Sequence, residues 1–494
     1  MRRLIVPFIL LAGVIAAFTL TTRADDASDP GHAVEANSSG NLAGTPLLSV
    51  RRAPDWLRRP TADTMLGRSI QTVLSNPSMP ESRCVSVHRD EIDVAKNQVG
   101  DMFAPGSLQR FTTAAAANEA LSADTVFRTE AVVQKSVEVS DEGVLDGDIW
   151  LVGGGDPLLA TSDYAHRIDR SRPFTDLEDL ADQVAGQLTS DGIAGISGAV
   201  LGDESKYAPA ERDYIDEDTP LGPVWTTEDN ADNTIGPLSA LQVNDGFTAW
   251  PETSDASQNV RSADPATDAA ALFSQLLADR GIEIAGAPGN AVAPQGAERR
   301  TLGDVESIPF SEILSLAIAP DGGTISEMLL KELGVRSGVT ALRFNAILFG
   351  EVVLLDRAGM PTAGTIIADG SGLSDLNRMS CDLLISILDN STDSSPLLAA
   401  IPDVEDGPLA GCTGPLDGEL RVLATAEADT SGTVGSYVAD NGDRVTFAMI
   451  INGPELGAEL GQCNAVQIAM IKAITGHPYG PALDELAPFP AVSG

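Results

Sequence analysis

The sequence predicts an α/β (α+β) protein in which one domain is split by an inserted β-rich domain. The chain has 494 residues, enough for two or three domains, and its hydrophobic share of 43% with 47 glycines is typical of a globular protein. Helical patterns dominate from 106 to 121 and from 310 to 354. Between them, short strands and turns prevail, which indicates inserted material.

The first 23 residues have the features of an export signal. Arg2 and Arg3 precede an uncharged run from Leu4 to Thr22. No small-x-small cleavage site follows, and the run is close to the ~20 residues that span a bilayer, so a signal peptide and a signal-anchor both fit. Residues 24–78 are expected to form a flexible tether because Asp, Ala, Ser, Gly and Pro are frequent there. The protein is therefore expected outside the cytoplasm.

The composition argues against several classes of partner. A formal charge of -40 repels nucleic acid, and the aromatic share of 4% argues against base stacking. The acidic residues are interpreted as a solvated surface rather than a cation-binding face. Four cysteines in an exported chain predict one or two disulfides whose pairing stays open. No Cys-x-x-Cys pair occurs, so no metal is expected, and no cofactor is predicted.

Periodicity predicts the elements of each domain. The split domain is expected at 79–126 and 301–480, the β-rich insertion at 127–300, and a tail at 481–494. Thr324 and Glu327 form a capping-box pattern, and Asn441-Gly442 predicts a type I′ hairpin turn. In the split domain, strands are expected at 84–88, 433–439 and 444–451, and helices at 106–121, 310–317, 324–333, 339–354 and 461–475. In the insertion, strands are expected at 126–139, 147–152 and 240–243, and helices at 177–188 and 265–280.

Several short segments carry a family resemblance through their shared order along the chain. They are Phe103-Ala104-Pro105-Gly106-Ser107, Phe127-Arg128-Thr129-Glu130, 143–148 running into 153–157, 236–241, Asp369-Gly370-Ser371-Gly372-Leu373-Ser374 with Asn377-Arg378, and 447–453. In this order the chain, from Ser82 to Thr475, resembles the low-molecular-mass penicillin-binding proteins of the D-alanyl-D-alanine carboxypeptidase/endopeptidase family. The resemblance implies a penicillin-binding, β-lactamase-like serine domain interrupted by a large insertion, and peptidoglycan stem peptides as ligands.

The resemblance makes Ser107 the nucleophile position, but the expected base is replaced. In Ser-x-x-Lys the lysine takes the proton of the serine, whereas this chain has Arg110, and a guanidinium keeps its proton. None of the five lysines lies three residues after a serine. Without the family role, Ser107 is interpreted as a helix cap, and Arg110 as a surface or salt-bridged residue rather than a clamp for a ligand carboxylate.

The two other family motifs are also substituted. The position of Ser-x-Asn falls on Asp321-Gly322-Gly323, so Gly323 has no side chain to donate a hydrogen bond and Asp321 adds negative charge. The position of Lys-Thr-Gly falls on Ala424-Thr425-Ala426, which retains only the threonine. Lys331 follows the second motif and is expected to be a solvated lysine on the helix surface.

These substitutions predict a pseudoenzyme of the cell envelope. It would bind peptidoglycan stem peptides or act as a scaffold with an envelope protein partner, secreted or held by an N-terminal anchor. The alternative is an active carboxypeptidase/endopeptidase that works through Ser107 with another base. A Ser-His-Asp triad is disfavoured because no Gly-x-Ser-x-Gly motif accompanies His32, His88, His166 or His477.

Overall fold

The computed structural model describes residues 55–480 except for 78, 168–171, 208–211, 213–222, 227–234, 251–259, 337–343, 393, 428 and 454–463. The predicted export signal, residues 24–54 of the predicted tether and the predicted tail lie outside the described residues. Among the described residues, no helix is both long enough and apolar enough to cross a membrane.

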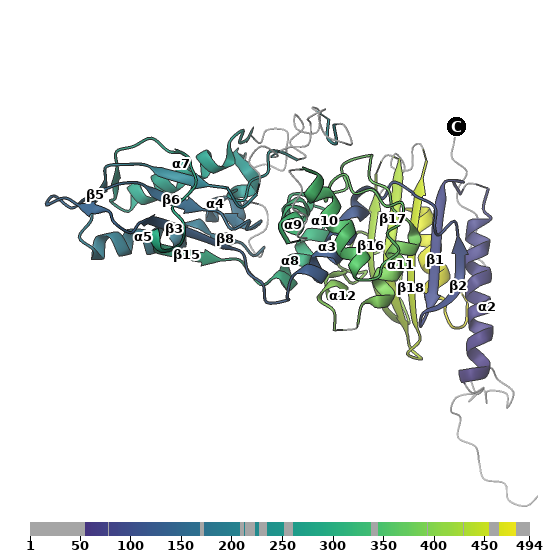
Figure 1. Ribbon diagram of the computed structural model, residues 1–494. Helices are drawn as coiled ribbons and strands as arrows, with labels where there is room; N and C mark the ends of the chain where they lie inside the picture. The colour runs from purple at the N-terminus through teal and green to yellow at the C-terminus, as the bar shows by residue number, and fades with distance from the viewer. Residues whose placement is uncertain are drawn as a thin grey trace, which may run out of the picture. The chain divides into compact units, whose positions relative to one another are not determined.

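A five-stranded antiparallel sheet forms the centre of the split domain, here called the serine domain (Figure 1). The two halves of the chain meet in it, because β1 from the N-terminal part pairs with β18 from the C-terminal part. In spatial order the strands are β16 (Gly418–Ala426), β17 (Thr430–Ala439), β18 (Arg444–Asn452), β1 (Arg83–Arg89) and β2 (Ile92–Asn97). The predicted strand at 84–88 and the predicted hairpin are confirmed. The turn is not type I′, since Gly442 has a positive φ and Asn441 does not.

Alternation along the strands lets both faces of this sheet be buried. In β1, Cys84 packs with the helices of one face, while Val85 and Val87 pack with α2 and α13 on the other. The first face is covered by η2 (Gly106–Leu108), α3 (Gln109–Ala120), α8 (Phe310–Ile318), α9 (Gly323–Arg336), α10 (Phe344–Arg357), α11 (Cys381–Asn390) and α12 (Pro396–Ala400). The second face is covered by α2 (Asp55–Leu74) and α13 (Ala465–Thr475).

Helix α2 corrects the prediction that residues 24–78 form a tether. Leu66, Ile70 and Val73 recur at helical spacing and are buried against the sheet. The apolar stripe is diluted by the polar residues of the opposite face, which is why composition alone indicated a flexible segment. The folded part therefore begins no later than this helix.

The other predicted helices of the serine domain are present with shifted ends. The stripe of Met470 and Ala473 in α13 lies in the core as expected. The predicted capping box of Thr324 and Glu327 is wrong, because α9 already begins at Gly323. The Glu327 side chain is fully buried and accepts a hydrogen bond from another segment of the chain instead. Residues 339–343 of the fourth predicted helix lie outside the described residues.

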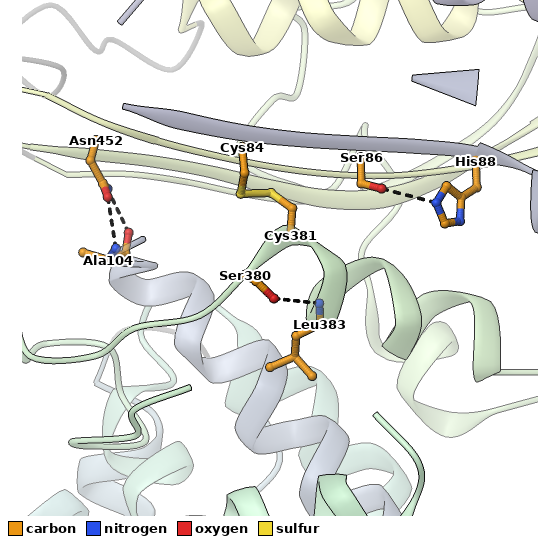
Figure 2. Close-up of a disulfide and its surroundings, with 8 residues drawn as sticks. All are labelled: Cys84, Ser86, His88, Ala104, Ser380, Cys381, Leu383 and Asn452. Atoms are coloured by element: carbon orange, nitrogen blue, oxygen red, sulfur yellow. Dashed lines mark hydrogen bonds between the residues drawn. A yellow bond between two sulfur atoms is a disulfide. The ribbon is translucent and has the colours of Figure 1, made fainter. Parts of the chain in front are cut away.

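A disulfide joins the two halves of the serine domain (Figure 2). Cys84 of β1 bonds to Cys381, the first residue of α11, with their Cα atoms 5.9 Å apart. The side chain of Ser380 accepts from the Leu383 N–H and caps this helix. The two cysteines lie on opposite sides of the insertion in the sequence. The disulfide therefore strongly reduces the conformational freedom of the unfolded chain.

The described part of the insertion contains a five-stranded sheet, a four-stranded sheet, two two-stranded sheets and two long helices. Its strands are β3 (Arg128–Gln134), β4 (Glu138–Val139), β5 (Val144–Asp146), β6 (Ile149–Val152), β7 (Leu159–Ala160), β8 (Thr175–Asp176), β9 (Gly195–Ile196), β10 (Val200–Asp203), β11 (Phe247–Ala249), β12 (Val260–Arg261), β13 (Glu283–Ile284), β14 (Gly289–Asn290) and β15 (Arg299–Glu306). Its helices are α4 (Ser162–Ala165), α5 (Leu177–Ser190), α7 (Pro265–Asp279), η4 (Asn244–Gly246) and η6 (Gly296–Glu298). The larger sheet has the order β14-β10-β6-β3-β15, and a smaller one has the order β13-β9-β5-β4.

The predicted helices at 177–188 and 265–280 are confirmed, but three details of the insertion differ. Strands β6, β10 and β14 pair in parallel, and α5 and α7 share one core with the sheets, so the insertion is α/β rather than only β-rich. Strand β15 pairs with β3 along its length, which moves the boundary from 300 to about 306. Residues 240–243 form no strand although they are buried.

Candidate active site

Ser107 lies in η2, immediately before α3, at a point held from both sides. Asn452 of β18 accepts from the Ala104 N–H at 3.0 Å and donates to the Ala104 carbonyl at 2.9 Å (Figure 2). Phe103 forms a backbone bridge with Met379. These contacts fix the chain just before Ser107, so the position of the serine is set by the sheet and by the segment before α11.

The loop Asp369–Ser374 packs directly against the backbone at Ser107. A Cβ at Gly372 would lie 2.1 Å from the carbonyl oxygen of Gly106, so only glycine allows this approach. The Asp369 carboxylate holds the loop, accepting from the Gly372 and Ser374 N–H groups and from three side chains: Trp225, Ser371 and Asn377. The loop is therefore rigid and fully hydrogen-bonded where it touches the candidate site.

The side chain that contacts Ser107 is Glu427, which directly follows β16. Its Oε1 accepts a hydrogen bond from the Ser107 N–H at 2.7 Å and another from Ser107 Oγ. Sequence reasoning missed this residue because it lies one position beyond the third motif. An acidic residue there was a readable signal, since it adds charge beside the expected cleft.

Arg110 is held by backbone carbonyl groups. Its Nε donates to the Ser371 oxygen at 2.9 Å, and its Nη1 donates to the oxygens of Ala319 and Pro320 at 2.8 and 2.7 Å. Burial lowers the pKa of the guanidinium, and the charge of Glu427 opposes that change. No carboxylate within the described ranges lies at salt-bridge distance from it. Arg110 is thus bonded through Nε and Nη1 to backbone carbonyl groups rather than paired with a described carboxylate, and it also lines the cavity described below.

The structure brings Gly323 next to Arg110 and leaves Asp321 outside the site. A Cβ at Gly323 would lie 3.7 Å from Arg110 Nη2, so the guanidinium lies where a longer side chain at 323 would extend. Asp321 is largely exposed and pairs with Arg172 of the insertion at 2.6 Å. The two substitutions of the second motif therefore lie in different environments. Gly323 leaves space for the Arg110 guanidinium, whereas Asp321 pairs with a residue of the insertion.

The end of β16 lines a cavity of about 940 Å³ together with Ser107, Arg110 and Glu427. Ala424, Thr425 and Ala426 all lie along it, on the edge strand of the sheet. Gln467 of α13 donates to the carbonyls of Thr425 and Gly432, which ties the end of this strand to its neighbour. Of the predicted site residues, Ser107, Arg110, Ala424, Thr425 and Ala426 thus share one cavity.

Arg421 is the second arginine among the described residues that line this cavity. Arg421 lies 3.6 Å from the Asp403 carboxylate and donates to the carbonyls of Ala399 and Ile401. Asp406 and Glu427 also line the cavity. Among the described residues that line the cavity there is no lysine to supply the charge of a Lys-Thr-Gly strand.

Two buried glutamates lie behind the site. Burial raises the pKa of Glu327 to about 8, with a further upward contribution from Asp369, and burial raises the pKa of Glu351 to about 7. Glu327 accepts from the N–H groups of Gly370 and Ser371, so it supports the loop rather than the cavity. Lys331 is 1% exposed and acts electrostatically on Glu327, which corrects the expectation of a solvated lysine.

The described histidines do not form a second site. His88 contacts Ser86 through Nε2 at 3.3 Å (Figure 2) and Asp389 through Nδ1 at 2.5 Å. This arrangement resembles a triad, but Ser86 is fully buried. His477 pairs with Asp443, and His166 packs on Phe174. His32 lies outside the described residues. No group of three or more His, Cys, Asp or Glu side chains in the described part of the chain is arranged to hold a metal ion.

The geometry combines a domain split by an insertion, a serine directly before a helix, and an edge strand that lines the same cavity as this serine. The sequence profile of the D-Ala-D-Ala carboxypeptidase 3 (S13) family matches residues 66–256 and 250–474. The chain therefore belongs to this family, as its motifs predicted, and the predicted penicillin-binding-type fold is confirmed.

Individual relatives agree with this assignment. A D-alanyl-D-alanine carboxypeptidase of Actinomadura sp. (strain R39) is 24% identical over 84% of this chain and 86% of its own length. Carboxypeptidase DacB of Mycolicibacterium smegmatis is 25% identical over 70% of this chain and 71% of its own. The fold matches that of penicillin binding protein 4 (dacB) from Haemophilus influenzae, with a TM-score of 0.61, 18% identity, and coverage of 82% of this chain and 97% of the other.

Proposed function

We propose that this protein is a cell-envelope member of the S13 family that binds peptidoglycan stem peptides in the Ser107 cavity but has lost most of its acyl-transfer activity. The observation that carries the proposal is the environment of Arg110. The residue at the position of the base is a guanidinium bonded to three carbonyl oxygens, so it accepts no proton from Ser107. The loss of a positioned base typically costs ~10²–10⁴ in rate.

The cavity itself supports binding. Its volume of about 940 Å³ is large enough for several residues of a peptide, and the edge strand β16 forms one wall. An extended peptide can add to such an edge through main-chain hydrogen bonds. The N-terminal sequence supports export, and the same stretch supports either cleavage or anchoring. An envelope protein partner would fit a scaffold role.

Titration calorimetry with a soluble muropeptide tests this function. We expect binding by the wild-type protein and loss of binding in Ala426→Trp, because Ala426 is exposed on the cavity wall and a large side chain there fills the space. Ala278→Trp is the matched control, since Ala278 is an exposed position on α7 outside the cavity. Absence of binding by the wild type, or equal binding by Ala426→Trp, would contradict the proposal.

One contact favours a second candidate, a slow carboxypeptidase or endopeptidase. Glu427 Oε1 accepts the Ser107 hydroxyl hydrogen bond and could receive its proton during attack on a peptide carbonyl. In that case D-Ala would be released from a stem pentapeptide, and release would disappear in both Ser107→Ala and Glu427→Gln. Release that persists in Ser107→Ala would eliminate this candidate.

A further inference from the structure

The carboxylate of Glu427 lies where a bound ligand oxygen would otherwise be expected. In acyl transfer the attacked carbonyl oxygen becomes an oxyanion, and it needs N–H donors close to the attacking serine. The Ser107 N–H is such a donor, because Oγ and N–H belong to one residue and both point to the same oxygen atom of Glu427. A single internal carboxylate therefore uses the nucleophile and its neighbouring donor together.

The local backbone is arranged for this contact. Gly106 has a φ of +53°, and a Cβ there would lie 2.5 Å from Glu427 Oε2, so a side chain at 106 would displace the carboxylate. The Glu427 N–H donates to the Thr430 oxygen at 2.8 Å, which closes the turn that follows β16. The start of α3 adds a favourable field for a negative charge next to Ser107.

Among the described residues, no positively charged side chain forms an ion pair with the Glu427 carboxylate. No Lys, Arg or His side chain in those ranges lies within 4.0 Å of it, and Arg110 is committed to carbonyl oxygens. The pair of bonds from Ser107 is thus the main anchor of Glu427. Charge-assisted hydrogen bonds of this kind are stronger than neutral ones.

We propose that Glu427 is an internal ligand that closes an oxyanion-binding site at Ser107. In the wild-type protein the site is occupied, and it excludes a carbonyl or a tetrahedral anion from the serine. Removal of the carboxylate opens the site to a tetrahedral oxyanion such as a boronate. The inference concerns the serine end of the cavity and holds whichever peptide the rest of the cavity binds.

Phenylboronic acid is a suitable probe because its reaction with a serine needs no leaving group. The Oγ lone pair adds to trigonal boron and forms a B–O bond, the hydroxyl proton goes to solvent, and the tetrahedral boronate carries the negative charge. Its oxygens then need the Ser107 N–H that Glu427 holds in the wild type. Binding can be followed by titration calorimetry, and adduct geometry by the ¹¹B NMR shift.

The experiment compares wild type with Glu427→Ala and Glu427→Gln. We expect Glu427→Ala to bind the boronate at least roughly tenfold more tightly than wild type, because a charge-assisted competitor is gone. Glu427→Gln, which keeps the size of the side chain, should show a smaller gain. Glu419→Gln, an exposed position on β16, removes the same charge and should leave binding unchanged.

Equal affinity of Glu427→Ala and wild type, with melting temperatures showing that both are folded, would overturn the proposal. If Glu427→Ala does not fold, Glu427→Gln decides in the same way. A gain that survives in Ser107→Ala/Glu427→Ala would also overturn it, because the boronate would then be bound elsewhere. Muropeptide binding is measured separately, so failure here leaves the proposed function untouched.

Discussion

The loop behind Ser107 and the cavity in front of it differ in what they keep of the family pattern. Behind the serine, Asp369 and Asn377 form a buried network in which the loop N–H groups are bonded. In front of it, the positions expected to carry a base and a cation hold Arg110 and Ala424. The comparison teaches that the support of a site and its chemistry depend on different residues, so a family fold can persist while its reactive groups change.

The largest expected effect comes from the supporting loop. Asp369→Ala removes an acceptor of five hydrogen bonds and leaves buried donors without partners, so we expect a loss of roughly 5 kcal/mol in the free energy of unfolding. Chemical denaturation measures it. Asp375→Ala, an exposed position in the same segment, should change stability by less than about 0.5 kcal/mol. Similar losses in both variants would contradict a special role of the loop.

The second effect is the acylation activity expected when the substituted residues are changed to the residues of the family motifs. Arg110→Lys alone should not restore acylation by benzylpenicillin, because the groups of a catalytic unit act together. The combined change Arg110→Lys, Asp321→Ser, Gly323→Asn, Ala424→Lys, Ala426→Gly and Glu427→Ala should acylate roughly 10²–10⁴-fold faster than the single variant. Acylation rates measured by mass spectrometry test this. Full restoration by Arg110→Lys alone would show that the other substitutions are neutral.

The third effect is the pH dependence of the free energy of unfolding that arises from Glu327, which supports the loop behind Ser107. The pKa of Glu327 is raised from 4.5 in the unfolded chain to about 8, so the folded state binds one more proton between these values. Stability should therefore fall as pH rises through this window, by about 3 kcal/mol between about pH 5 and pH 8. Glu327→Gln keeps an acceptor for the Gly370 and Ser371 N–H groups and should flatten this slope, whereas the exposed Glu312→Gln should not. An unchanged slope in Glu327→Gln would contradict the assignment.

The smallest effect concerns Asp321, which lies outside both regions. Its carboxylate is 68% exposed and pairs with Arg172. Asp321→Asn should cost only about 0.2–1 kcal/mol, the usual value of an exposed ion pair. A double-mutant cycle with Arg172→Ala measures the coupling. A coupling above roughly 2 kcal/mol would mean that this pair holds the insertion in place.

The sequence predicted those parts of the fold that depend on local patterns. The helix that carries Ser107 and the hairpin of β17 and β18 follow from periodicity within a few residues. The apolar stripe of α2 was missed because Leu66 and Ile70 are surrounded by polar residues. The Cys84–Cys381 pairing could not be read, since four cysteines allow several pairings and only the tertiary fold brings these two together.

The sequence predicted only part of the site, because motifs are local patterns and do not reveal contacts between distant segments. Ser107, Arg110 and the end of β16 line one cavity, and the roles that the motifs assign to them stay predictions. The contact between Arg110 and Gly323 and the contact between Ser107 and Glu427 depend on segments that are distant in sequence. Arg110 and Gly323 both lie at motif positions, whereas Glu427 lies outside every motif, so its contact with Ser107 required the three-dimensional structure.

Intact-protein mass spectrometry after incubation with benzylpenicillin tests the central claim most directly, with Ser107→Ala as the control. The account predicts no covalent adduct on the wild-type protein at long times and high drug concentration, because Arg110 takes no proton and Glu427 occupies the Ser107 N–H. A stoichiometric mass increase that disappears in Ser107→Ala would contradict it and would show that Ser107 is still an activated nucleophile.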